Sequence, residues 1–176
     1  MTVPQTIVLE TDRLILRRLT PGDLDALHAL YRDAEVRRYF PEGTLSYEET
    51  REELEWIIEV YYGKYGYGLW ATIHKETGEF IGRCGLLPWT IEGRFEVEVA
   101  YLLARAYWGQ GLGTEAAQAI LDYGFEQLGL ERLICLIDAD NRASMRVAEK
   151  IGMAFEKDVV DDLGPARLYS RQKPAS

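Results

Sequence analysis

The stretch FEVEVAYLLARAYWGQGLGTEAAQAI, residues Phe95–Ile120, contains the change of pattern that decides the fold. In Phe95–Leu103 the residues alternate with the two-residue period of a β-strand. From Ala116 onward, apolar residues recur at the spacing of a helix. Glycines at alternate positions separate the two patterns: Gly109, Gly111 and Gly113. The sequence therefore predicts a strand, a glycine-rich turn, and a helix that begins at Gly113 or Thr114.

The alternation in this strand assigns its side chains to two faces. We expect one face toward the core, with Phe95, Val97, Val99, Tyr101 and Leu103. The other face carries Glu96, Glu98, Ala100 and Leu102. For Glu96, exposure to solvent on the outer face is the preferred interpretation. Glu98 lies nearer the glycine turn, and a site role and plain exposure are equally favoured.

The glycine-rich turn has the features of a site for a phosphate-bearing ligand. The first turn of a helix has free backbone N–H groups and a dipole that favours an anion. Glycines let a ligand approach these groups because they have no Cβ. The pattern GxxxxGK[ST] is absent because no Lys follows the last glycine. Gly111-x-Gly113-x-x-Ala116, with Asp138 downstream, keeps a dinucleotide ligand as an alternative.

The rest of the chain predicts a mixed sheet with helices on it, in the order β-α-α-β-β-β-α-β-α-β-β. Strands are expected within 9–18 and over 69–74, 79–87, 95–103, 133–137, 155–160 and 166–170. Helices are expected over 23–33, from the capping box of Ser46 and Glu49, after Gly113, and over 143–150. Hairpin turns are expected at 75–78 and 92–93. The fold class is α/β of the α+β kind, with six to seven strands.

Length and composition narrow the class of protein. A chain of 176 residues fits one domain, residues 1–176. No apolar stretch is long enough for a membrane span, and the N-terminus lacks a signal-peptide pattern, so we expect a cytoplasmic protein. Cys84 and Cys135 are expected to be reduced core residues, with no metal site. The net charge of −9 argues against nucleic acid as a partner.

Three motifs in register resemble the GNAT family of N-acetyltransferases, in particular its ribosomal-protein N-terminal acetyltransferase (RimJ/RimL-type) branch. Tyr107–Ala116 resembles the branch's YWGxGxxTEA form of the cofactor loop. Asn141–Met153 is similar to its NxxSxxxxxKxGF segment, with Met153 at the Phe position. Glu10–Arg17 is similar to its ETxRLxLR start. The resemblance covers almost the whole chain and implies a GNAT fold, with the sheet splayed between the fourth and fifth predicted strands.

The resemblance implies that acetyl-CoA is the cosubstrate and a primary amine is the acceptor, either a protein N-terminus or a small molecule. The cofactor loop would bind phosphates through Gly109, Gln110, Gly111, Leu112, Gly113 and Thr114. Backbone groups of Tyr101, Leu102 and Leu103 would bind the pantetheine arm, as would Asn141 and Ser144. Arg142, Arg146 or Lys150 is a weaker candidate for the outer phosphate.

Direct attack by a neutral amine requires a base and a donor to the leaving sulfur. Glu98 is the candidate base. Many family members carry a Tyr donor at the position that is Ala148 here. Ser144 is the candidate replacement, but a local bond at the start of its helix is equally favoured. Tyr101 is a weaker candidate because it lies on the face predicted to be apolar.

Two other functions remain as alternatives, namely a non-catalytic acyl-CoA sensor and a dinucleotide-dependent oxidoreductase. The sequence does not identify the acceptor. It leaves the oligomeric state open, with a homodimer as the fallback.

Overall fold

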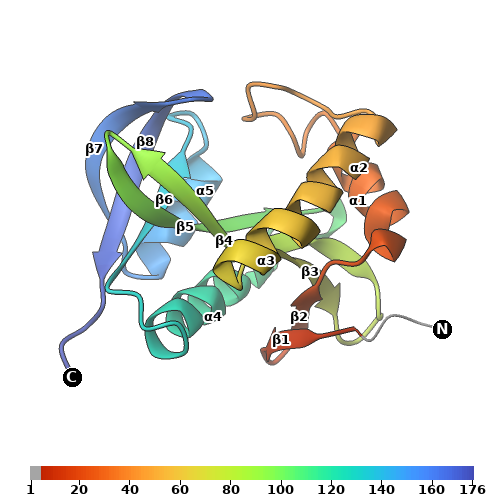
Figure 1. The fold of residues 1–176 in the computed structure, drawn as a ribbon, viewed down its shortest axis with the longest axis horizontal. Helices are drawn as coiled ribbons and strands as arrows, with labels where there is room; N and C mark the ends of the chain where they lie inside the picture. The colour runs from red at the N-terminus through yellow and green to blue at the C-terminus, as the bar shows by residue number, and fades with distance from the viewer. Residues whose placement is uncertain (1–4) are drawn as a thin grey trace.

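The computed structural model describes residues 5–176 and contains one mixed sheet of eight strands in the order β1-β2-β3-β4-β5-β6-β8-β7 (Figure 1). The strands are β1 Ile7–Glu10, β2 Leu14–Arg18, β3 Leu69–His74, β4 Phe80–Ile91, β5 Arg94–Leu103, β6 Arg132–Ile137, β7 Ala154–Asp161 and β8 Gly164–Gln172. All neighbours are antiparallel except β5 and β6. The predicted α+β class is confirmed. The predicted strand number is too low because β1, only four residues long, pairs with β2 as a separate edge strand.

The four predicted helices are present, with shifted ends, and a short additional helix, α3, follows the second. They are α1 Leu24–Tyr31, α2 Tyr47–Trp56, α3 Tyr62–Tyr65, α4 Leu112–Glu126 and α5 Arg142–Lys150. A π-helical segment, Ile57–Tyr61, joins α2 directly to α3. The predicted capping box starts α2, because Ser46 Oγ accepts from Glu49 N at 3.1 Å and Glu49 Oε2 accepts from Ser46 N at 2.7 Å. Among residues 5–176, no helix combines the length and apolarity needed to cross a membrane.

The helices cover both faces of the sheet. On one face, Arg83 of β4 donates through Nε to the hydroxyl of Tyr31 in α1, at 2.9 Å. On the other face, Trp70 of β3 packs edge-to-face on Tyr123 of α4, with ring centroids 5.5 Å apart. Helices therefore cover both faces of the central strands, and Figure 1 shows the sheet passing between α2 and α4.

Burial on both sides of β5 corrects the expected division of its side chains. Phe95, predicted to be in the core, is 55% exposed near the β4–β5 turn. Glu96, predicted to be exposed, is 5% exposed. Its carboxylate accepts from Arg132 Nε at 3.1 Å, and this ion pair accounts for a buried charge. Glu98 is buried too, although it lies at the point where β5 separates from β6.

The sheet opens between β5 and β6. Their only register pair is Glu98 with Ile134, whereas β4 and β5 pair continuously from Gly82–Leu103 to Ile91–Arg94. Beyond Glu98, Cys135 Sγ donates across the gap to the Val99 carbonyl at 3.3 Å. The C-terminal end of β5 is consequently not paired with β6. This is the splay that the resemblance implied, shifted by one strand in number because β1 precedes the first predicted strand.

Candidate active site

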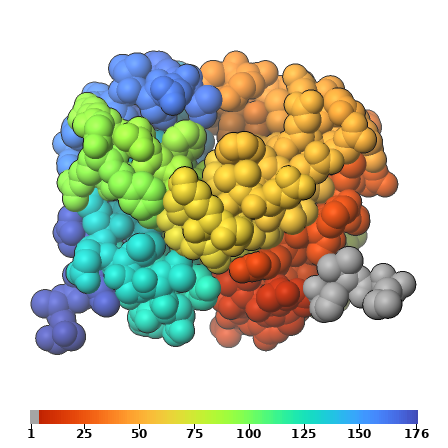
Figure 2. All heavy atoms as spheres, viewed as in Figure 1, coloured from red at the N-terminus to blue at the C-terminus, as the bar shows by residue number. Residues whose placement is uncertain are grey.

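A cavity of about 320 Å³ occupies the opening between β5 and β6. Residues 36–42, after α1, form one wall, and residues 161–166, around the β7–β8 turn, form the opposite wall. Figure 2 shows the surface hollowed between these two segments, coloured orange and blue. Glu98, Tyr101, Asn141 and Ser144 all line the cavity, so the fold brings together candidates that the sequence places up to 46 positions apart.

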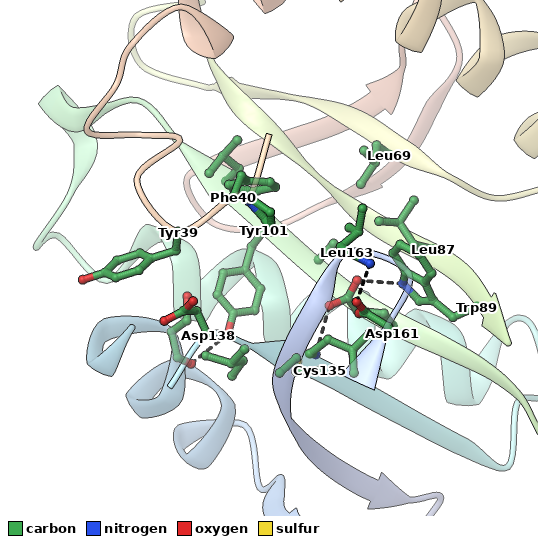
Figure 3. Close-up of a pocket in the computed structure, with 18 of the residues that line it drawn as sticks. Tyr39, Phe40, Leu69, Leu87, Trp89, Tyr101, Cys135, Asp138, Asp161 and Leu163 are labelled. Atoms are coloured by element: carbon green, nitrogen blue, oxygen red, sulfur yellow. Dashed lines mark hydrogen bonds between the residues drawn. The ribbon is translucent and has the colours of Figure 1, made fainter. Parts of the chain in front are cut away.

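Glu98 lies at the base of this cavity with both carboxylate oxygens bonded. Oε1 accepts from the indole N–H of Trp89 at 3.0 Å, and Oε2 accepts from the backbone N–H of Leu136 at 3.0 Å. Figure 3 shows the bond from Trp89 to this carboxylate, with the side chain of Asp161 close by. Burial raises the pKa of Glu98 to about 7, while the two bonds and the charge of Arg83 act to lower it. A carboxylate with this pKa exchanges a proton near neutral pH.

Trp89→Phe is expected to raise the pKa of Glu98 above about 7, because the indole N–H donates to the ionised carboxylate and stabilises it. The carboxyl carbon shift of Glu98, followed by NMR against pH, measures this pKa. Trp56→Phe is the matched control, since Trp56 also lines the cavity but makes no bond to Glu98. Equal pKa values in the two variants would contradict the assigned hydrogen bond.

The glycine-rich turn adopts a conformation that requires glycine. Gly109 and Gly111 have φ values of +72° and +78°, which side chains other than glycine rarely adopt. α4 begins at Leu112, earlier than the predicted Gly113 or Thr114, because left-handed Gly111 is itself the N-cap and its carbonyl accepts from Glu115 N at 3.0 Å. The backbone N–H groups of the first turn therefore have no helical partner.

Neighbouring atoms do not crowd Gly109 and Gly113 in this loop. A Cβ placed on Gly109 would meet nothing within 4 Å, and one on Gly113 would only touch Leu103 Cδ1 at 3.9 Å. The indole N–H of Trp108 donates to the Leu103 carbonyl at 2.8 Å and holds the loop against the end of β5. The backbone of Tyr101–Leu103, which is not paired with β6, thus leads directly toward the free N–H groups at the start of α4. This arrangement fits an elongated ligand with phosphates at one end.

Asn141 and Ser144 face this strand from the start of α5. Asn141 is the N-cap, and its Oδ1 accepts from Ser144 N at 3.2 Å, which leaves its amide N–H groups available. The Ser144 hydroxyl has no hydrogen bond to residues 5–176, and the local first-turn bond at this helix start is made by the Ser144 backbone N–H. Tyr101 donates its hydroxyl to the Ser144 carbonyl at 2.8 Å, as Figure 3 shows. Tyr101 therefore lies in the opening, although the sequence favoured a core position.

Several residues of the cavity were outside the sequence prediction. No local pattern marks Trp89 as a site residue, because its bond to Glu98 depends on the pairing of β4 with β5. Asp161 and Leu163 line the far wall. They lie in a turn, and no local pattern indicates which strand end such a turn will reach.

The opened sheet, the glycine turn leading into a helix, and the buried carboxylate beside them fit an acyltransferase. Residues 13–154 match the sequence profile of the Acetyltransferase (GNAT) domain. The chain belongs to the GNAT family. It is 41% identical over 165 residues to the Bacillus subtilis protein YkkB, covering 93% of this chain and 95% of that protein. The crystal structure of an acetyltransferase from Agrobacterium tumefaciens is similar, with a TM-score of 0.79, 27% identity, and coverage of 98% and 96%.

Two further relatives have names that state an acceptor. The Escherichia coli spermidine N(1)-acetyltransferase is 27% identical over 157 residues, which is 84% of this chain and 76% of that enzyme. The RimL ribosomal L7/L12 alpha-N-protein acetyltransferase has a TM-score of 0.77, with 20% identity and coverage of 96% and 94%. At 20% identity, this similarity shows a shared fold only. The predicted family is thus confirmed, and RimL-type enzymes are among its structural neighbours.

Proposed function

We propose that this acetyltransferase moves an acetyl group from acetyl-CoA to a primary amine by direct attack of the amine on the thioester. The observation that carries the proposal is Glu98, a buried carboxyl group with a pKa of about 7 at the base of the cavity, where β5 parts from β6. The opening also adjoins the glycine-rich turn.

Glu98 would act as the base. An α-amine has a pKa of roughly 8 and is mostly protonated at neutral pH, so a proton must leave before the nitrogen attacks. A general base works best when its pKa lies near the operating pH, and burial brings Glu98 there. Asp138 and Asp161 also line the cavity and add negative charge that favours entry of a cationic amine.

The residues that would hold acetyl-CoA are those of the splay and the turn. When bound, it supplies an acetyl group activated as a thioester. The backbone from Gly109 to Thr114 would bind the phosphates, and the backbone of Tyr101, Leu102 and Leu103 would bind the pantetheine arm. Asn141 would donate its amide N–H groups from α5. One lone pair of the Leu103 carbonyl is already used by Trp108, which leaves the other for a ligand.

Ser144 would donate a proton to the departing sulfur, because Ala148, at the position of the family's Tyr, is buried and has no proton to give. Tyr101 is less suited since its hydroxyl already donates to the Ser144 carbonyl. Ser144→Ala is expected to lower kcat by roughly tenfold or more while the Kd for acetyl-CoA changes little. Steady-state rates and calorimetric titration measure the two quantities. Unchanged kcat would remove Ser144 from the mechanism.

The proposal is tested by release of free thiol from acetyl-CoA in the presence of an amine panel that includes peptides with free α-amines, spermidine and amino acids. Turnover that depends on the amine is the expected result. Tight binding of acetyl-CoA without turnover across the panel would favour the non-catalytic sensor. Stabilisation by NAD(H) alone in thermal unfolding would favour the oxidoreductase.

We also propose that residues 1–176 act as a single catalytic unit in the cytoplasm. Strands from both ends of the described chain, β1 and β8, join one sheet. Cys84 and Cys135 are buried free thiols, which suits a reducing compartment. For the oligomeric state, a homodimer is the default hypothesis.

A further inference from the structure

The turn between β1 and β2 is bonded to the cofactor loop, although about a hundred residues separate them in sequence. The side chain of Arg13 donates through Nε to Glu115 Oε2 at 2.7 Å and through Nη1 to the Gln110 carbonyl at 2.9 Å. The backbone N–H of Arg13 and the hydroxyl of Thr11 donate to Glu115 Oε1 at 2.9 and 2.8 Å. Two of these hydrogen bonds hold the Arg13 guanidinium beside Gly111, and the other two hold the Glu115 carboxylate that it contacts.

Glu115 creates an electrostatic problem for an anion at this loop. It stands in the first turn of α4, where a carboxylate stabilises the helix but repels a phosphate that would use the same N–H groups. Burial acts to raise the pKa of Glu115, but the bonds from Thr11 and Arg13 outweigh it and hold the pKa below its usual range. The carboxylate is therefore charged at neutral pH, and Arg13 is the cation that offsets it.

The Arg13 guanidinium has donors left over after these bonds. Nη2 has no hydrogen bond to residues 5–176, and it lies 3.5 Å from the place that a Cβ on Gly111 would take. The Arg13 side chain is 45% exposed, so a ligand can reach it beside the loop. A guanidinium held by a carboxylate and a carbonyl loses little side-chain freedom on binding a phosphate.

We propose that Arg13 is a cofactor-binding residue whose guanidinium donates to the pyrophosphate of acetyl-CoA, with Glu115 as the positioning residue that aims it. This inference rests on the proposed function, because it requires acetyl-CoA at the glycine-rich turn. It assigns a direct role to the turn between β1 and β2, which the sequence motif ETxRLxLR did not specify.

The test compares Arg13→Gln with Glu115→Gln, each of which breaks the same ion pair from one side. Arg13→Gln removes the phosphate donor and leaves Glu115 unopposed, so the Kd for acetyl-CoA, measured by calorimetry, is expected to rise roughly tenfold to a hundredfold. Glu115→Gln keeps one oxygen for the Arg13 bond and removes a negative charge, so the Kd is expected to stay equal or fall. If the pair only braced the loop, both variants would weaken binding to a similar extent, and the proposal would be overturned.

Two controls separate binding from folding. Acetyl-pantetheine carries the thioester and the arm without the pyrophosphate, so Arg13→Gln is expected to leave KM for this compound unchanged. A similar rise in KM for acetyl-pantetheine would overturn the direct contact. Arg13→Lys retains the charge but lacks the planar pair of N–H donors of a guanidinium. An intermediate Kd is expected for it, even if Arg13→Gln unfolds.

If the unaltered chain fails to bind acetyl-CoA, the proposed function itself is wrong, and so is the proposed role of Arg13. Binding by the unaltered chain with no change in Arg13→Gln rejects only the role of Arg13.

Discussion

Glu98→Gln is expected to lower kcat by about a hundredfold to ten-thousandfold, because an amide cannot take the proton of the attacking amine. In the unaltered enzyme the rate should rise as pH increases through about 7, since the carboxyl group acts as a base only when it is ionised. That rise should disappear in the variant. Both effects are checked by measuring rates with an amine acceptor from the panel, from about two pH units below the pKa to about two above it.

Glu96→Gln is the matched control for this experiment. Glu96 is also a buried carboxylate on the same face of β5, but it is paired with Arg132 and lies outside the cavity. Its replacement should affect stability and leave the rise near pH 7 in place. A Glu98→Gln variant that keeps the pH dependence of the unaltered enzyme would show that another group is the base.

Gly111→Val is expected to raise the Kd for acetyl-CoA by more than about tenfold, because relief of backbone strain at this position would displace the loop. Gly111 has a φ of +78°, which a β-branched residue adopts only under strain. Relief of that strain would rotate the peptide units that begin α4 and misalign its free N–H groups. The new side chain would also crowd the Arg13 guanidinium, which lies 3.5 Å from the Cβ position. Calorimetric titration with acetyl-CoA measures the loss.

Gly78→Val separates strain from loss of the site. Gly78 has a similar φ of +71° in the β3–β4 turn, with open space around its Cβ position and no contact with the cavity. Both variants should unfold at a lower temperature, and only Gly111→Val should lose the ligand. Normal affinity in Gly111→Val would mean that the loop is wrongly assigned.

The order of elements was predictable because most neighbours in the sheet are neighbours in the chain. The turns at 75–78 and 92–93 join strands that pair directly, so local signals were enough to predict them. β1 was missed because four residues carry little periodicity. The expected exposure of Glu96 was wrong because alternation shows that two faces differ and does not show whether the second face is covered. Its partner, Arg132, arrives from β6.

The sequence by itself determined the family, the turn and the helix that follows it, because glycine conformation and helix starts depend on residues close together in the chain. Only the tertiary structure decided the chemistry of the groups beside that turn. The pKa of Glu98 depends on burial, on Trp89 from β4 and on Leu136 from β6. Arg13 reaches the loop across 102 residues. Desolvation and hydrogen bonding act through space, and the packing of distant segments determines them.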